Sequence, residues 1–252
     1  MTSPGTVSVP VEGVQLPADL HLPLAGPGPG IVLFQEIFGV TAYVMTRARD
    51  LAALGYAVLV PHVYWRQGDP VIEDGDDALP RAMAAMGRLD WDEAVADGAA
   101  ALAALRARPE VTGPVGVVGF CFGGGLAFAI AARNAAGGRE ARSTAAGTGP
   151  DALVSYYGSA LPNLLHLAGQ VRCPSLHHFG LDDAYIPADV VRRIEAAVTT
   201  PGADTTFRTY PGAGHAFDNP SPAFHHAAAA RQAWAATAAW LAKRLPVRAP
   251  GE

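Results

Sequence analysis

Short apolar runs alternate with longer amphipathic stretches along most of the chain. The runs are rich in β-branched residues and end at Gly, Pro or Asp, as strands do, whereas the stretches carry apolar residues at helical spacing. We expect strands over Thr6–Val9, Val14–Leu22, Gly30–Phe34, Ala57–Val60, Val115–Gly119, Ala152–Tyr156, Ser175–Phe179 and Thr205–Tyr210. We expect helices over Val44–Leu54, Arg81–Met86, Trp91–Arg106, Gly123–Arg133, Ala188–Val198 and Pro222–Arg244. This alternation predicts an α/β fold with a mostly parallel sheet, an antiparallel N-terminal edge and helices on both faces.

Length and composition indicate one globular domain over residues 1–252, because doubly wound folds often reach this size undivided. Half of the residues are apolar and 16% are charged, unlike a disordered chain. The net charge of -5 argues against nucleic acid or an anionic membrane as partner. No apolar run approaches the roughly 20 residues of a membrane-spanning helix, and the N-terminus lacks a secretory signal. We expect a cytoplasmic monomer or small homo-oligomer that acts on a small molecule.

One polar segment interrupts the alternation. Residues Arg66–Pro80 are acidic and contain two prolines, which is typical of a solvent loop. We interpret the segment as an excursion that faces the substrate, not as a linker between domains.

Of the two cysteines, Cys121 and Cys173, the first lies in a strand-turn-helix context. The expected strand runs into Gly119-Phe120-Cys121-Phe122-Gly123 and then into an apolar helix, as in the G-x-S-x-G nucleophile elbow with Cys in place of Ser. A helix N-terminus favours a thiolate. An isolated cysteine is more often buried and structural, but this context favours a nucleophile. We expect both thiols to be reduced.

Two later turns supply candidates for a catalytic acid and base. Asp182 follows the strand at Ser175–Phe179, with Asp183 as the alternative, and His215 follows the strand at Thr205–Tyr210 in a Gly-rich loop. The order nucleophile, acid, histidine is that of a hydrolytic triad on an α/β sheet. His177 and His178 lie inside or at the end of a strand, so we expect them to be core residues or to support the site from behind. No cluster has the spacing of metal ligands, so neither a metal nor another cofactor is expected.

The loop after the strand at Gly30–Phe34 is the third candidate. In this architecture an oxyanion hole combines the backbone N–H after the nucleophile, here Phe122, with one from this early loop, for which we predict Ile37. Glu36 is then within reach of Cys121, although composition alone would make it a surface residue.

These residues together resemble the dienelactone hydrolase family, also called carboxymethylenebutenolidase, a cysteine-nucleophile branch of the α/β-hydrolases. The likeness covers about Val14 to Leu241. It is carried in chain order by Gln35-Glu36-Ile37-Phe38-Gly39, Gly119-Phe120-Cys121-Phe122-Gly123-Gly124, Tyr156-Tyr157-Gly158, Gly180-Leu181-Asp182 and Gly214-His215-Ala216-Phe217.

The resemblance implies a chemistry for these residues. Cys121, Asp182 and His215 would form the triad, and Glu36 would deprotonate the thiol once substrate binding frees its carboxylate. A lactone or enol ester would then be opened through a thioester acyl-enzyme.

The resemblance also implies two arginines that hold a substrate carboxylate. Arg81 matches the first, but residues 216–220 after the histidine contain no arginine, and an acidic residue there, Asp218, could repel an anion. Tyr157 and Trp65, with Tyr64 and Arg66, are further candidates for lining the pocket.

Three alternatives remain open at this point. The first is a broader carboxylesterase or thioesterase for uncharged acyl substrates, which the missing arginine favours. The second is a non-catalytic relic that binds or regulates, against which the complete triad argues. The third is a cysteine peptidase, which the elbow context disfavours.

Overall fold

The computed structural model describes residues 5–73, 75–136 and 149–247, which form one eight-stranded sheet. Its strands are β1 (Gly5–Val11), β2 (Val14–His21), β3 (Gly28–Phe34), β4 (Ala57–Pro61), β5 (Val111–Phe120), β6 (Leu153–Tyr156), β7 (Ser175–Gly180) and β8 (Thr205–Tyr210). The helices are α1 (Ala42–Ala53), α2 (Ala78–Gly87), α3 (Trp91–Arg106), α4 (Phe122–Ala136), α5 (Leu161–Leu164), α6 (Ala188–Val198) and α7 (Ala227–Arg244), with 3₁₀ turns at Trp65–Gln67 and Leu165–Gln170.

The sheet has the order β1-β2-β4-β3-β5-β6-β7-β8. β1 and β2 pair antiparallel, β2 joins β4 antiparallel, and all pairs from β4 to β8 are parallel. The predicted antiparallel edge on a mostly parallel sheet is confirmed.

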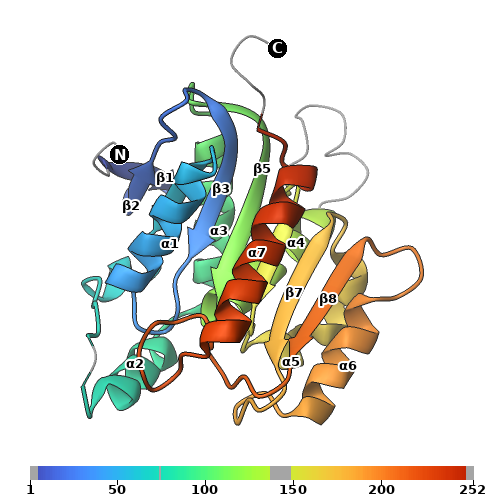
Figure 1. The fold of residues 1–252 in the computed structure, drawn as a ribbon. Coiled ribbons are helices and arrows are strands. Elements are labelled where there is room, and N and C mark those ends of the chain that lie inside the picture. The colour runs from blue at the N-terminus through green and yellow to red at the C-terminus, as the bar shows by residue number, and fades with distance from the viewer. Residues whose placement is uncertain (1–4, 74, 137–148, 248–252) are drawn as a thin grey trace.

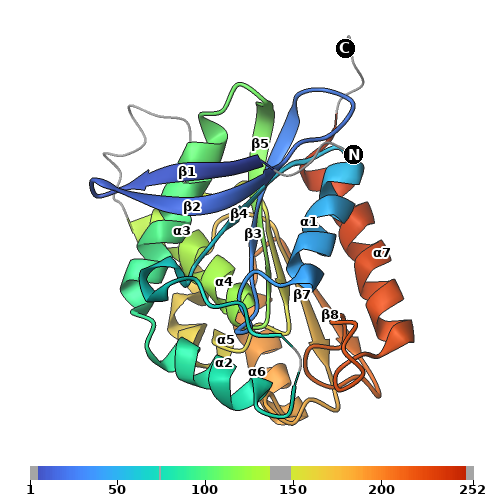
Figure 2. The same cartoon turned by 90° about the vertical axis from the view of Figure 1, so that its left-hand side faces the viewer.

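Helices cover both faces of the sheet, with α1 and α7 on one face and α3 and α4 on the other (Figure 2). Every residue of β3, β4, β6 and β7 is therefore buried, which explains why β3 and β4 have few polar side chains. The edge strand β1 instead alternates between exposed and buried positions near its end.

The carboxyl ends of the parallel strands meet at one end of the molecule, where α2 also lies (Figure 1). The loops after β3, β5, β7 and β8 leave the sheet at this end, and each carries one of the candidate residues. Ligands of open α/β sheets bind outside these strand ends.

Two differences from the sequence prediction lie near this end, whereas β5 differs at the opposite end, where it begins at Val111 instead of Val115. α7 begins at Ala227 instead of Pro222, because a turn precedes it and the ring of His226 accepts the N–H of Ala229 at 3.2 Å. The short α5 was not predicted. Within the acidic excursion, residue 74 lies outside the described residues. None of the helices in the described ranges has the length and apolarity to cross a membrane.

Candidate active site

Cys121 lies between the last residue of β5 and the first residue of α4, with φ of 53°. A left-handed backbone is strained for a residue with a Cβ, so the surrounding packing must hold it. A Cβ on Gly119 would lie 2.0 Å from the carbonyl oxygen of Gly123, and one on Gly123 would lie 2.4 Å from that of Gln35. Both glycines of the motif are therefore required by the backbone itself.

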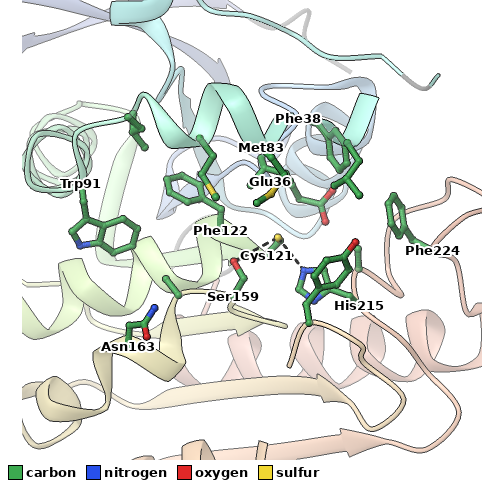
Figure 3. A pocket seen from close by; sticks show the side chains of 17 residues that line it. Glu36, Phe38, Met83, Trp91, Cys121, Phe122, Ser159, Asn163, His215 and Phe224 are labelled. Carbon is green, nitrogen blue, oxygen red and sulfur yellow. Dashed lines mark hydrogen bonds between the residues drawn. The ribbon is translucent and has the colours of Figure 1, made fainter. Parts of the chain in front are cut away.

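The thiol of Cys121 faces the imidazole of His215 (Figure 3). Sγ lies 3.1 Å from Nε2 and 3.7 Å from the hydroxyl of Ser159. His215 stands on the loop after β8. The pair expected from the sequence is therefore brought into hydrogen-bond contact.

The carboxylate that contacts the histidine is that of Asp183, not the expected Asp182. Oδ2 of Asp183 lies 2.7 Å from Nδ1 of His215, and its Oδ1 accepts the backbone N–H groups of Tyr185 and Ile186 at 2.8 and 2.9 Å. Asp182 donates its backbone N–H to the carbonyl of Ala213, and its side chain is exposed. In the turn after β7 it is therefore Asp183, the alternative, whose side chain points toward His215, and the prediction of Asp182 for this contact was wrong.

The electrostatics of the pair favour a charged imidazole. Burial lowers the pKa of His215, but the adjacent Cys121 and the carboxylate of Asp183 outweigh burial and raise this pKa well above its ordinary value. The imidazole is therefore suited to take and hold a proton.

The backbone N–H groups of Ile37 and Phe122 belong to residues that line the same cavity as Cys121. Neither group has a hydrogen-bond acceptor within the described ranges. The hydroxyl of Tyr64 donates to the carbonyl of Ile37 at 3.0 Å and so fixes this turn. The excursion also supports the turn, because Ile72 donates its N–H to the carbonyl of Phe38 at 2.9 Å.

Glu36 lines the cavity from a buried position, 1% exposed. Its carboxylate accepts the amide of Asn219 at 2.7 Å and the hydroxyl of Tyr157 at 3.3 Å. Burial raises the pKa of Glu36 to about 7, although the donors Asn219 and Tyr157 and the nearby His215 oppose the shift. The carboxyl group of Glu36 thus changes charge near neutral pH. Its hydrogen-bond partners are Asn219 and Tyr157, not Cys121.

A buried polar network that the sequence did not reveal lies behind Glu36. The hydroxyl of Tyr43 is 3.3 Å from that of Tyr157 and donates to Asp218 at 2.5 Å. Asp218 also accepts two hydrogen bonds from the guanidinium of Arg47, each 2.8 Å long. Asp218 is therefore neutralised by Arg47 and does not face substrate, contrary to the expected repulsion. Tyrosines and aspartates 114 to 175 residues apart carry no sequence signal of such pairing.

The cavity above Cys121 has a volume of about 430 Å³, within the range of small-molecule sites. The side chains with polar atoms that line it are Glu36, Cys121, Ser159, Asn163, Tyr185 and His215. Most of the others are apolar, among them Phe38, Met83, Met86, Leu89, Trp91 and Phe224. Leu79 at the end of the excursion and Met83 and Met86 of α2 form part of the wall.

This cavity is lined by none of the predicted substrate-binding residues, which are Arg81, Tyr157, Trp65, Tyr64 and Arg66. Arg81 projects from α2 with 55% of its side chain exposed and pairs with Asp77 at 3.6 Å. Tyr157 is fully buried behind Glu36. Trp65 donates its indole N–H to Asp97 at 2.9 Å, beneath Arg66. The helical turn of α2 that faces the cavity begins with Leu79 and continues with Met83, so Arg81 lies on the opposite side.

Comparisons with known proteins show the family to which the chain belongs. The model of the dienelactone hydrolase family matches residues 16–245. A carboxymethylenebutenolidase of a Pseudomonas species is 32% identical over 242 residues, 95% of each chain, and that of Pseudomonas putida is 34% identical over 212 residues, 82% of this chain and 83% of the relative.

Solved structures have the same fold. A putative dienelactone hydrolase from Klebsiella pneumoniae superposes with a TM-score of 0.80 at 28% identity, over 96% of this chain and 98% of that chain. A dienelactone hydrolase-like promiscuous phosphotriesterase from metagenomic libraries gives 0.76 at 25% identity over the same shares. The α/β-hydrolase fold is thus confirmed, and the chain is an enzyme of the dienelactone hydrolase family.

Proposed function

We propose that this enzyme hydrolyses a lactone or another ester of a small molecule through Cys121, His215 and Asp183, with a thioester as intermediate. The observation that carries the proposal is the contiguous set of contacts from Sγ to Nε2 at 3.1 Å and from Nδ1 to Asp183 at 2.7 Å. Family membership favours a lactone as substrate. The chemistry agrees, because an enol lactone releases a stabilised enolate as leaving group when its carbonyl is attacked.

The first half-reaction forms the thioester. Sγ of Cys121 gives its proton to the carboxylate of Glu36, which substrate binding frees, and attacks the substrate carbonyl, whose oxygen becomes negative between the N–H groups of Ile37 and Phe122. Asp183 accepts a hydrogen bond from Nδ1–H and stabilises the imidazolium of His215. When the tetrahedral intermediate collapses, the ester C–O bond breaks and the imidazolium gives a proton to the leaving oxygen.

Hydrolysis of the thioester restores the enzyme. A water molecule gives a proton to His215 and attacks the thioester carbonyl, and the C–S bond breaks as the carboxylic product forms. The thiolate of Cys121 then regains its proton from Glu36, and His215 is again charged. In a lactone both oxygens of the broken ester remain in one product.

Trapping the thioester tests this proposal. Rapid quenching during turnover of an aryl ester, followed by mass spectrometry, should find the acyl group on Cys121. Cys121→Ala should lower kcat/KM by about 10⁴-fold or more, because the nucleophile is lost. Cys173→Ala is the matched control, since burial raises the pKa of that thiol to about 12 and it should keep full activity. An acyl group on another residue, or turnover by Cys121→Ala, would refute the mechanism.

For Glu36 we propose the switch that the family resemblance implies. Its carboxylate can reach the thiol only after it releases Asn219 and Tyr157. Glu36→Gln keeps the shape of the side chain but removes the base, so kcat/KM should fall by about 10²-fold. An unchanged kcat/KM in Glu36→Gln would leave His215 as the sole base and rule out the switch.

A further inference from the structure

Within the described part of the chain, no Arg or Lys side chain lines the cavity above Cys121. The wall carries one carboxyl group, Glu36, and otherwise neutral amide, hydroxyl and apolar side chains beside the catalytic pair. A substrate carboxylate in this cavity would lose its hydration without gaining a charged hydrogen-bond donor. The loss of water around an unpaired charge is costly.

Two arginines that are candidates for binding an anion are held by buried carboxylates. Arg47 is bound to Asp218 and to Asp50, and Arg66 to Asp97 and Glu93. Releasing either guanidinium would leave a buried carboxylate, Asp218 or Asp97, without its partner, which is strongly destabilising. Neither is therefore available to turn toward an anionic substrate.

The cavity extends to both sides of Cys121 (Figure 3). Trp91 and Phe122 lie on one side of the thiol, and Phe38 and Phe224 lie on the other. An ester whose carbonyl carbon reaches Sγ therefore has aromatic surface for its acyl part and for its alcohol part.

Apolar side chains at the rim remain in contact with water. Leu79 is 36% exposed, Met83 47% and Tyr185 58%, and all three line the cavity. Exposed apolar side chains that cluster around a cavity are typical of a binding site for an apolar ligand.

We propose that the enzyme selects uncharged esters or lactones with apolar groups on both sides of the scissile carbonyl and discriminates against substrates that carry a carboxylate. The inference rests on the proposed hydrolase function and names its substrate class. Met83, on the face of α2 that borders the cavity, is a specificity-determining residue in this arrangement.

Matched substrate pairs test the preference. Methyl 4-nitrophenyl adipate and 4-nitrophenyl hydrogen adipate have the same reacting bond, and the free carboxylate replaces a methyl ester at the far end of the acyl chain. A second pair carries the carboxylate or its methyl ester on the alcohol side. We expect kcat/KM to be at least about tenfold higher for the uncharged member of each pair, chiefly through KM.

A cation placed in the wall should reverse the preference. Met83→Arg puts a guanidinium at the cavity, and we expect the ratio of kcat/KM for the charged over the uncharged ester to rise by about tenfold or more. Ala84→Arg is the matched control, because this exposed neighbour on the same helix does not line the cavity, and its ratio should equal that of the wild type.

Binding separates this inference from the proposed chemistry. Calorimetry on Cys121→Ala, which lacks the nucleophile, should show tighter binding of the uncharged ester even if no ester is ever turned over. Tight binding without turnover in the wild type would refute the hydrolase and support the substrate class. Equal or better binding and turnover of the carboxylate would overturn the substrate class and leave the hydrolase standing.

Discussion

In the proposed triad, Asp183 is held through both of its carboxylate oxygens. One carboxylate oxygen accepts two backbone N–H groups and the other contacts His215, so the side chain has no freedom to turn away. Its carboxylate selects the tautomer in which Nε2 faces the thiol.

The two adjacent aspartates therefore give a sharp test of the triad. Asp183→Asn keeps the backbone contacts but offers an amide to Nδ1, so kcat/KM should fall by about 10²-fold to 10⁴-fold. Asp182→Asn alters an exposed neighbour and should change kcat/KM by less than about twofold. Steady-state kinetics of both variants measure the difference, and a larger loss in Asp182→Asn would return the role to that residue.

Sequence reasoning placed Cys121 and His215 in contact but chose the wrong aspartate. Glycines around Cys121 fix the backbone at that point, so the chain itself marks the position. The turn after β7 has no such glycine pair, and two aspartates follow Leu181 that the sequence does not distinguish. Which one points inward depends on Ala213 of another loop, which accepts the N–H of Asp182.

Among the structural elements, the turn between β5 and α4 is the most tightly constrained. Gly119 lies against the backbone of Gly123, and Gly123 lies against the carbonyl groups of Phe34 and Gln35 after β3, so closely that neither position has space for a Cβ. This closeness also brings Phe122 near Ile37, whose N–H groups would receive the oxyanion.

Adding one methyl group at this turn should therefore unfold or inactivate the protein. Gly119→Ala would place its Cβ 2.0 Å from a backbone oxygen, so we expect a loss of more than about 3 kcal/mol in the free energy of unfolding. Gly87→Ala, where a Cβ meets no atom within 4 Å, is the control and should be neutral or slightly stabilising. Urea denaturation compares them, and a stable, active Gly119→Ala would contradict the close approach.

For helix α2 the sequence predicted the helix but not the side of it that faces the cavity. Its existence followed from the sequence, but Arg81 was assigned to the cavity when Met83 lies there. The sequence did not show which side of this helix faces the cavity, and residues two positions apart lie on opposite sides of a helix. The boundary at Asp77 sets the phase.

In the molecule as a whole, the strands along the chain and the helices on both faces of the sheet were predicted from the alternation of apolar runs. The polar contacts within the core were not, because Glu36, Asn219, Tyr157, Tyr43, Asp218 and Arg47 are joined only by the fold. Helices and strands can be predicted from local patterns of apolar residues. Contacts between side chains of different helices and strands cannot, because they depend on how the whole sheet assembles.

Two of the assembled core residues, His177 and His178 of β7, make the fold sensitive to acid. Burial lowers the pKa of His177 to about 4, and burial with nearby positive charge lowers that of His178 to about 3. Neither ring nitrogen of His177 has a hydrogen-bond partner among the described residues, and its ring packs against Phe128 and Phe207. A protonated imidazole at His177 would therefore have no hydrogen-bond acceptor among the described residues to stabilise its charge.

The sign of the pH effect follows from proton uptake. Between about pH 6.5 and pH 4 the unfolded chain binds a proton at His177 that the folded protein does not, so stability falls as pH falls through this window. His177→Phe removes this difference and should reduce the slope of unfolding free energy against pH by up to about 1.4 kcal/mol per pH unit. Urea titrations from pH 4 to pH 7 measure it, with His225→Gln, at an exposed position, as the control for losing a histidine as such. A slope in His177→Phe as steep as in the wild type would show that His177 is not the residue through which acid unfolds the protein.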